Sequence, residues 1–510
     1  MEETSVSITS YLSRNEQQYG EREAIVFINS DKERCCMNWR ELNEFSNKVA
    51  NMLITKGISK GDKIAILLSN SLLWMPIYFG ILKMGAVVVP LNYNNHIDDI
   101  IYYVKYADCK GIFLSEDNKC WDIFEKTDDI FVYSIDNLTE SMSEYGADDI
   151  GIELLDKDAA AIYFSSGTTG KSKAVLLSHG ALQSAAEIEL SHHNQKHEDK
   201  FLCLTPLYHT GSKIHWFGSL LVGGTLVIAT FTSPLCIMDV MEREKISIVW
   251  LLVPQIQDIL DYIESRDISA NEKLSALRLM HSGAQPVPPS LILRWHNKFP
   301  HILYDTNYGL TESTGPGCIH LGVKNIEKAG AIGKPDSNWL IDIVNDSGVS
   351  VENEIIGELI LKGPGVMCEY YKDKEATDKT LKKGWLYTGD MAYKDKDGFI
   401  YLVDRKKDII ISGGENIYPV QIESYIRSLE CIKDVAVIGL PSKRMGEIVA
   451  AVIELKEGFL CSKKDIFMYC KELPEYQRPM RIYFGTVARN ATGKIDKKLL
   501  RNKMLNRQSV

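Results

Sequence analysis

In the first half of the chain, short apolar segments with strand character alternate with segments of helical spacing. Lys63–Leu68 and Ala86–Pro90 are two such strands, and the helical segment Leu72–Met84 lies between them. Further strands are expected at Phe201–Leu204, Gly224–Ala229, Ile248–Val253 and Leu277–Met280. Parallel strands that are covered by helices produce this alternation. The sequence therefore predicts an α/β fold in which one large domain contains two α/β halves.

The pattern changes in the second half of the chain. From about residue 325 the strands are shorter and are separated by Gly and Asp turns, as in Gly357–Gly363, which indicates a β-rich subdomain. The charged segment Asp404–Asp408 interrupts two apolar strands and has the character of a hinge. We therefore expect a large domain over 1–403, a hinge over 404–408 and a small α+β domain over 409–510.

Net charge, apolar stretches and cysteine content limit the partners that the chain can bind and the compartment in which it is expected. The net charge of −10 argues against general binding to nucleic acid or to an anionic membrane, since phosphate groups require a basic surface. The longest apolar stretches, Trp74–Leu91 and Ile214–Thr230, are interrupted by charged residues, Gly or Pro, which predicts a core helix that runs into a strand and no transmembrane segment. The acidic start is unlike a secretory signal, and the 11 cysteines contain no CxxC pair, so a reduced cytoplasm is expected.

A strand at Ala159–Phe164 runs directly into the loop Ser165–Lys173, which reads S-S-G-T-T-G-K-S-K. Gly167 and Gly170 allow the backbone to approach a ligand closely, and the loop adds hydroxyls, amides and two lysines. These groups suit a polyphosphate. A turn of the same composition without a ligand is the alternative.

The residues Gly170-Lys171-Ser172 also resemble the end of a Walker P-loop. That motif requires a glycine at the position of Ser165 and a helix directly after its lysine. Here the strand-like run Ala174–Leu177 follows, and the next helical signal begins at Ser178. The sequence therefore predicts a phosphate loop of a different kind.

This loop resembles the (S/T)SGTTGxPKG phosphate loop of the adenylate-forming enzymes, a family that includes acyl-CoA and aryl-CoA ligases, firefly luciferase and peptide-synthetase adenylation domains. Ser172 replaces the family's usual proline and Ala174 its usual glycine, changes that affect the stiffness of the loop. Six more segments resemble family motifs in the expected order, and they are Pro206–Gly211, Ser282–Pro286, Thr306–Glu312, Tyr387–Asp390, Ser412–Asn416 and Asn490–Lys494.

The resemblance implies an AMP-forming acid–thiol ligase that uses ATP, Mg²⁺ and coenzyme A. A carboxylic acid first attacks the α-phosphorus of ATP and releases pyrophosphate; the thiol then displaces AMP from the acyl-adenylate. The resemblance assigns Glu312 and Thr168 to Mg²⁺ and makes Glu312, His209 and Lys494 catalytic, Lys494 acting on the α-phosphate after the small domain closes. It assigns ATP to Ser165, Ser166, Gly167, Thr168, Thr169, Lys173, Gly283, Ala284, Thr306, Asn307, Tyr308, Thr311, Asp390 and Arg405.

For the second step, the resemblance implies that the small domain is mobile, rotating with Lys407 at the hinge and bringing Gly413 and Gly414 to the pantetheine arm. Without the family, Gly413-Gly414 is simply a turn. Asp390 alone is a turn former, and Lys494 alone is a solvated lysine before the helical segment Ile495–Met504.

The acid pocket is expected near His209, Ser212, Trp216, Trp250 and Ser282. Lys213 and His215 add polarity there and either meet a polar substrate or face solvent. Three alternatives stay open: loading of a carrier-protein phosphopantetheine, a nucleotide-binding regulator without catalysis, and a luciferase-like oxygenase. A homodimer also stays open, and the identity of the acid is not determined.

Overall fold

The computed structural model of the chain describes residues 7–127, 129–165, 172–266, 273–489 and 495–506. By its internal contacts the chain divides into two units. The first contains Met1–Ile341 and Leu361–Leu386, and the second contains Asp342–Ile360 and Tyr387–Val510.

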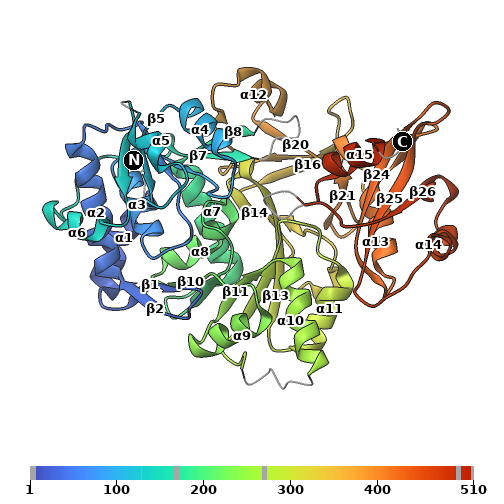
Figure 1. Ribbon diagram of the computed structural model, residues 1–510, viewed down its shortest axis with the longest axis horizontal. Coiled ribbons are helices and arrows are strands. Elements are labelled where there is room, and N and C mark those ends of the chain that lie inside the picture. Colours follow the sequence, from blue (N-terminus) through green and yellow to red (C-terminus); the bar gives the residue numbers. More distant parts are fainter. Residues whose placement is uncertain (1–6, 128, 166–171, 267–272, 490–494, 507–510) are drawn as a thin grey trace. The chain divides into compact units, whose positions relative to one another are not determined.

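The largest sheet of the first unit has nine strands (Figure 1). Its order is β15 (Lys334–Pro335), β14 (Gly315–His320), β13 (Leu303–Leu310), β12 (Leu279–Ser282), β11 (Ile248–Leu251), β9 (Lys200–Cys203), β10 (Thr225–Ala229), β1 (Glu23–Ile28) and β2 (Arg34–Asn38). The strands from β1 to β13 in this order are parallel, and β2, β14 and β15 pair antiparallel at the two edges. Several of the parallel strands therefore end at one edge of the sheet, where ligands of α/β proteins bind.

A second sheet of the first unit has seven strands. Its order is β18 (Glu369–Tyr370), β8 (Lys173–Ser178), β7 (Ala159–Ser165), β4 (Val87–Pro90), β3 (Lys63–Ile66), β5 (Cys109–Leu114) and β6 (Phe131–Ser134). The strands from β7 to β6 in this order are parallel, while β8 pairs antiparallel with β7 and with β18. The two parallel-cored sheets confirm the predicted pair of α/β halves.

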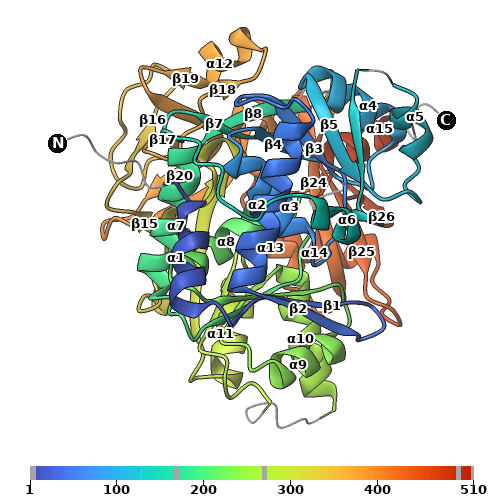
Figure 2. The same cartoon turned by 90° about the vertical axis from the view of Figure 1, so that its left-hand side faces the viewer.

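Helices of the first unit cover these sheets and pack on one another. They are α1 (Ser10–Tyr19), α2 (Trp39–Thr55), α3 (Trp74–Lys83), α4 (Ile97–Tyr106), α5 (Trp121–Glu125), α6 (Leu138–Ser141), α7 (His179–His193), α8 (Thr210–Leu221), α9 (Pro234–Arg243), α10 (Val253–Ser265), α11 (Pro289–Lys298) and α12 (Lys374–Thr380). In Figure 2, α2 runs beside α3, and the two helices are in contact. α7 contacts α8, and both contact β14.

Local signals explain where the helices begin. Asn38 caps α2, since its side-chain oxygen accepts a hydrogen bond from the amide of Glu41. The Glu41 carboxylate in turn accepts a hydrogen bond from the amide of Asn38. Ser178 caps α7 by accepting from the amide of Ala181. Asn194 then ends α7 in a left-handed conformation with φ 44°.

The second unit and the residues next to it in sequence form two smaller sheets. One contains β16 (Leu340–Val344), β17 (Gly357–Lys362), β19 (Leu381–Lys382), β20 (Trp385–Lys394) and β21 (Ile400–Arg405). The other contains β22 (Ile410–Ser412), β23 (Glu415–Ile417), β24 (Ile432–Ser442), β25 (Gly446–Leu455) and β26 (Arg481–Phe484). Apart from the β25–β26 pair, the described pairings of these strands are antiparallel.

The β24–β25 hairpin has an apolar core on each face. Helices α13 (Pro419–Arg427) and α14 (Lys463–Tyr469) contribute to one core, and α15 (Lys497–Asn506) contributes to the other. Ile422 and Ile466 are fully buried on the first face, and Leu500 and Met504 are buried on the second. This is the small α+β part that the sequence predicts.

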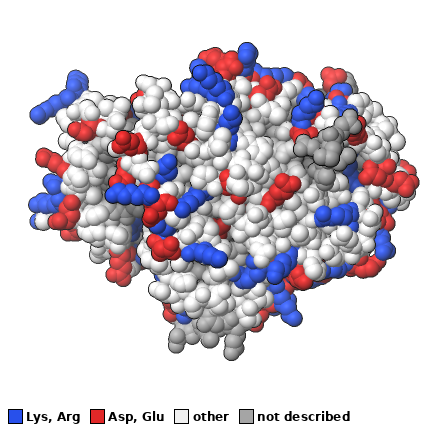
Figure 3. Space-filling view, turned by 180° about the vertical axis from the view of Figure 1, so that it is seen from behind, with Lys and Arg blue, Asp and Glu red and all other residues white. Residues whose placement is uncertain are grey.

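Most predicted elements match the structure within a few residues. The two long apolar stretches are α3 followed by β4 and α8 followed by β10, as expected. Among the described residues, every helix is too short or too polar to cross a membrane. On the face shown in Figure 3, the described Lys and Arg side chains lie among Asp and Glu side chains.

Candidate active site

The phosphate-loop segment connects two antiparallel strands. Ser165 at the end of β7 pairs with Lys173 at the start of β8, and β8 continues to Ser178 before α7 begins. The prediction that a strand follows the loop is therefore confirmed, whereas a Walker motif continues directly into a helix. Ser166, Gly167, Thr168 and Thr169 lie outside the described residues, as does Lys494.

Lys173 and Glu312 both contact Tyr370. The Nζ of Lys173 lies 4.3 Å from the centre of the Tyr370 ring, and the Tyr370 hydroxyl donates a hydrogen bond of 2.8 Å to Oε1 of Glu312. Burial, reinforced by the Glu312 charge, raises the pKa of Tyr370 far above its usual value, so the hydroxyl keeps its proton and acts as the donor. One aromatic residue thus connects the end of the phosphate loop to the predicted Mg²⁺ ligand.

Sequence reasoning did not identify Tyr370. It lies 58 residues after Glu312, on the short strand β18 that pairs with β8. Glu312 is on the 3₁₀ turn Thr311–Ser313, whose position is fixed by a hydrogen bond from the amide of Met367 to the Glu312 carbonyl. Nothing in the spacing of these residues signals the contact.

The loop end is also attached to α4. The hydroxyls of Ser172 and Tyr103 are 2.9 Å apart, and the Tyr103 ring stacks on Phe164 with ring centres 4.2 Å apart. Ser172, which replaces the family's proline, therefore has a hydrogen-bonded partner. This contact restrains the residue where the sequence suggested a looser loop.

The motifs predicted for the adenine side lie at or near the carboxyl ends of β12 and β13, beside β11. Leu251 pairs with Ser282, and Ser282 pairs with Thr306, whose hydroxyl donates a bond of 2.8 Å to the Ser282 carbonyl. Ala284, just beyond β12, has φ 65°, a strained value for a residue other than glycine.

Gly283 belongs to the same motif, and the side chains of its neighbours come close to its backbone. A Cβ on Gly283 would lie 3.1 Å from Oδ1 of Asn307 and 3.7 Å from Nε1 of Trp250. Asn307 and Tyr308 are buried on β13, and Thr311 begins the 3₁₀ turn that carries Glu312. The structure thus brings Trp250, Gly283 and Asn307 together, although they are far apart in sequence.

Helix α8 carries two of the predicted pocket residues, Ser212 and Trp216. His209 precedes its first residue, and Ser212 is buried and accepts a bond of 2.7 Å from the Thr205 hydroxyl. Trp216 is fully buried and packs against Phe79 and Phe217.

Lys213 and His215 both lie in the interior, which excludes the expectation that they face solvent. Nζ of Lys213 donates bonds of 2.9 Å to the carbonyls of Leu207 and His209, and burial holds the pKa of Lys213 well below its usual value. His215 lies against Trp250, with ring centres 4.8 Å apart.

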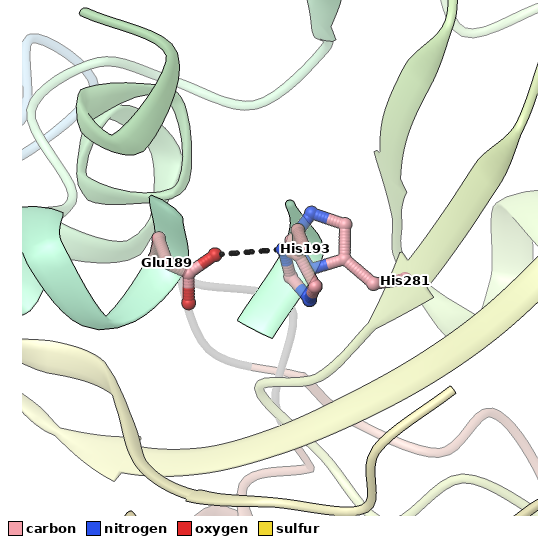
Figure 4. Close-up of side chains that lie close together, drawn as sticks. All are labelled: Glu189, His193 and His281. Carbon is pink, nitrogen blue, oxygen red and sulfur yellow. Dashed lines mark ion pairs between the residues drawn. The ribbon is translucent and has the colours of Figure 1, made fainter. Parts of the chain in front are cut away.

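His215 also belongs to a buried cluster that combines Glu189, His193, His281, Asp305 and His320. Figure 4 shows three of these side chains, those of Glu189, His193 and His281. Nδ1 of His193 lies 3.2 Å from Oε2 of Glu189, and Nε2 of His193 lies 2.9 Å from Oδ2 of Asp305. Burial lowers the pKa of His193, but the two carboxylates outweigh it and raise the pKa to about 9. This cluster was not predicted from the sequence.

The predicted ribose motif lies in the second unit. Asp390 on β20 and Arg405 on β21 are cross-strand partners, and Nε of Arg405 lies 2.6 Å from Oδ1 of Asp390. The amide of Asp390 donates to the Thr388 hydroxyl, and the hydroxyl donates to the carbonyl of Leu359. Asp390 is therefore held in place by both strands, with a cation beside it.

The predicted second-step residues also lie in the second unit. Lys407 is on the 3₁₀ turn Lys406–Asp408. Gly413 and Gly414 connect β22 to β23 with φ of 61° and 90°, the pattern of a two-residue hairpin turn that glycine adopts without strain. A Cβ on Gly414 would meet no atom within 4 Å, whereas one on Gly413 would approach the methyl group of Met445 to 2.7 Å.

Two sequence profiles of known families match the chain. Residues 12–371 match the profile described as "AMP-binding enzyme", and residues 421–494 match "AMP-binding enzyme C-terminal domain". The chain belongs to the AMP-binding enzyme family. The recognised resemblance to adenylate-forming enzymes is confirmed.

Relatives of this AMP-binding enzyme agree with the match. The long-chain-fatty-acid–CoA ligase FadD13 of Mycobacterium tuberculosis is 31% identical over 474 residues, covering 91% of this chain and 92% of the relative. A 2-succinylbenzoate–CoA ligase of Bacillus cereus is 29% identical over 470 residues, covering 92% and 93%.

A solved structure, the o-succinylbenzoate CoA synthetase MenE of Bacillus subtilis with its acyl-adenylate intermediate, has a TM-score of 0.85 and 27% identity and covers 97% of each chain. The predicted class of activity, ATP-dependent ligation of an acid to CoA by way of an acyl-adenylate, is confirmed.

Proposed function

We propose that this AMP-binding enzyme uses Mg²⁺–ATP to adenylate an acid that carries a hydrogen-bond acceptor beyond its reacting carboxylate, and then transfers the acyl group to free CoA. The observation that carries the proposal is the contact of Lys173 and Glu312 with one side chain, Tyr370. It supplies a cation for phosphate oxygens and an oriented carboxylate for a hard divalent ion.

In the first step, a carboxylate oxygen of the acid bonds to the α-phosphorus of ATP, the bond from the α-phosphorus to the bridging oxygen breaks, and pyrophosphate leaves. We assign the β- and γ-phosphates to Ser165, Ser166, Gly167, Thr168, Thr169 and Lys173. Glu312 and Thr168 fit Mg²⁺ because carboxylate and hydroxyl oxygens are its preferred ligands. Bound there, Mg²⁺ supplies positive charge that offsets the negative charge of the phosphates.

The remaining nucleotide contacts are assigned by residue type. The Asp390 carboxylate suits a ribose diol, and Arg405, which already holds it, adds a charged donor. Gly283, Ala284, Thr306, Asn307, Tyr308 and Thr311 are assigned to the adenine side. Lys494 is proposed to stabilise the charge that develops at the α-phosphate, and His209 to orient the acid.

For the second step, we propose that the domain over 409–510 rotates about the hinge 404–408 relative to the domain over 1–403. The thiol sulfur of CoA then bonds to the acyl carbon, and AMP leaves with the bonding electrons. Gly414 has open space where a side chain would stand, which supports passage of a narrow pantetheine arm. All 11 cysteines are free thiols, which supports a reducing compartment such as the cytoplasm.

Two orphaned polar atoms support the proposed class of acid. Nε1 of Trp250 and Oγ of Ser282 are buried and have no hydrogen-bond partner among the described residues, and these two residues lie at the carboxyl ends of the neighbouring strands β11 and β12. An unsatisfied buried polar group costs about 1–3 kcal/mol. An acid with an oxygen acceptor beyond its carboxylate satisfies such donors, and a plain alkyl chain does not.

The proposal is tested by measuring acid-dependent pyrophosphate release over matched pairs of acids. The two acids of each pair have equal size. One carries a keto, hydroxyl or second carboxyl oxygen beyond its reacting carboxylate, and the rest of the other is purely alkyl or aryl. We expect higher kcat/KM for the oxygen-bearing members, and Trp250→Phe to reduce that preference. A preference for the apolar members would refute the class of acid while leaving adenylation intact.

The acceptor is tested separately with the best acid. Thioester formation with free CoA is compared with loading of a phosphopantetheinylated carrier protein. Efficient loading of the carrier protein without turnover of CoA contradicts the proposed acceptor. Absence of acid-dependent pyrophosphate release with every acid contradicts the whole proposal.

A further inference from the structure

The buried cluster below the carboxyl ends of β11–β13 is built from four elements. Glu189 and His193 lie one turn apart on α7, His281 is on β12, Asp305 is on β13 and His320 is on β14. Each of these side chains is at most 2% exposed. In Figure 4 the imidazoles of His193 and His281 lie together, and a carboxylate oxygen of Glu189 points toward the ring of His193.

Asp305 fixes the tautomers of two histidines. Its Oδ2 accepts from Nε2 of His193 and from Nδ1 of His320, both at 2.9 Å, and its Oδ1 accepts from the amides of Thr306 and Gly322. Because a neutral imidazole has one N–H, the second nitrogen of each ring then carries a lone pair.

Both lone pairs are directed to the same carboxylate. Nδ1 of His193 is 3.2 Å from Oε2 of Glu189, and Nε2 of His320 is 3.7 Å from its Oε1. Neither nitrogen has a hydrogen-bond partner of acceptable geometry among the residues that the structure describes. Lone pairs that face a buried carboxylate repel it, so the arrangement requires a cation, which is either a proton on an imidazole or a metal ion.

His281 distinguishes these two solutions. Within the described part of the chain, neither of its ring nitrogens has a hydrogen-bond partner, although the side chain is fully buried. One atom from each of Glu189, His193 and His281 lies within 4.8 Å of the other two. A proton on His193 leaves His281 unsatisfied, whereas a metal ion between the three side chains accepts a lone pair from it.

We propose that Glu189, His193 and His281 bind one divalent transition-metal ion, with Zn²⁺ as the best fit. Two imidazoles and one carboxylate favour Zn²⁺ over Mg²⁺ or Ca²⁺, which prefer oxygen ligands. Metal-bound histidines almost always donate their other N–H to a carboxylate or carbonyl, as His193 does to Asp305. His320 is available as a fourth ligand.

The site is structural, and it adds to the proposed ligase chemistry without taking part in it. The ion joins α7 to β12, and the Glu189 carboxylate also accepts from Nδ2 of Asn307 at 3.3 Å and lies 3.1 Å from Nδ1 of His215. Asn307 is assigned to the adenine side, and His215 packs on Trp250. Metal binding therefore stiffens the layer beneath the nucleotide and acid positions.

The test uses the full-length protein without a histidine tag, purified from zinc-supplemented cells and dialysed against metal-free buffer. Elemental analysis is expected to find Zn²⁺ at close to one ion per chain. Refolding or exchange with Co²⁺ is expected to give the visible absorption of a cobalt ion with nitrogen and oxygen ligands. Zn²⁺ at well below a tenth of an ion per chain, with no uptake of Co²⁺, overturns the proposal.

The variant His281→Leu distinguishes a bound metal ion from a network that is held together by a proton on an imidazole. If His281 is a ligand, the variant loses at least tenfold in zinc content, its Tm falls, and a chelator that lowers the wild-type Tm leaves the variant unchanged. If no metal binds, removal of two orphaned nitrogens leaves the Tm equal or higher, which refutes the proposal. His301→Leu, at an exposed turn after α11, is the matched control and keeps the wild-type zinc content.

Discussion

The contact between Tyr370 and Glu312 allows a sharp test of the first half-reaction. Tyr370→Phe removes only the hydroxyl that donates to Oε1 of Glu312 at 2.8 Å, and it keeps the ring beneath Lys173. A hydrogen bond to a charged partner contributes about 1.5–3 kcal/mol. Since each 1.36 kcal/mol corresponds to a factor of ten in rate, loss of this bond lowers the rate of adenylation about 10- to 150-fold.

The assay is pyrophosphate release over a range of Mg²⁺ concentrations. Because the hydroxyl orients the predicted Mg²⁺ ligand, the variant should also require more Mg²⁺ for half-maximal rate, and high Mg²⁺ should restore part of the activity. A purely structural role would lower the Tm without changing the dependence on Mg²⁺.

Tyr371→Phe is the matched control. Its hydroxyl donates to Oδ2 of Asp108 at 2.9 Å, and Asp108 lies at the surface, so this bond should contribute little to the rate. If Tyr370→Phe matches Tyr371→Phe in rate and in Mg²⁺ dependence, the inferred link between Lys173, Tyr370 and Glu312 is wrong.

Three further predictions concern stability. Tyr103→Phe removes the bond to Ser172 and should lower the free energy of unfolding by about 0.5–1.5 kcal/mol in urea titrations, with Ser172→Ala adding little in the double variant; additive losses would show that the hydroxyls are not coupled. Ala284→Gly relieves φ 65° and should raise the free energy of unfolding by about 0.5–1 kcal/mol, and a decrease would contradict strain at this residue. Burial raises the pKa of Asp404 to about 6, above the roughly 3.9 of an unfolded aspartate, so the folded state retains a proton that the unfolded state releases. Stability should therefore fall by up to about 3 kcal/mol as pH rises from 4 to 6, and Asp404→Asn should flatten this fall; an equal fall in the variant would exclude Asp404 as its origin.

Elements with strong local signals could be predicted from the sequence. Helix α2 (Trp39–Thr55) is one example, because a capping box starts it and its apolar spacing is regular. The strand after the phosphate loop was predictable from the apolar run Ala174–Leu177. Both signals lie within a few residues of the feature that they specify.

Contacts between distant segments could not be predicted in this way. Tyr370 meets Glu312 only because β18 joins the edge of the seven-stranded sheet, and no periodicity specifies that pairing. The sequence left open whether His215 faces solvent, since α8 has buried residues on all sides and its spacing does not single out one face. The pairing of His281 with Asp305 follows from the register of β12 and β13, which becomes known only with the sheet order.

Two unsatisfied side chains and one strained backbone angle lie at the carboxyl ends of β11 and β12, although other described residues of the first unit also have unsatisfied polar atoms or positive φ. Trp250 and Ser282 leave polar atoms unsatisfied there, and Ala284 holds a strained backbone angle. Each such feature costs about 1–3 kcal/mol, which is a sizeable part of the stability of a folded protein. An apolar replacement would remove the cost of either unsatisfied side chain, so their presence at one edge is better explained by a ligand than by packing. Binding of the acid or the nucleotide should satisfy these polar groups. It should therefore raise the Tm by more than binding to a preformed apolar pocket would.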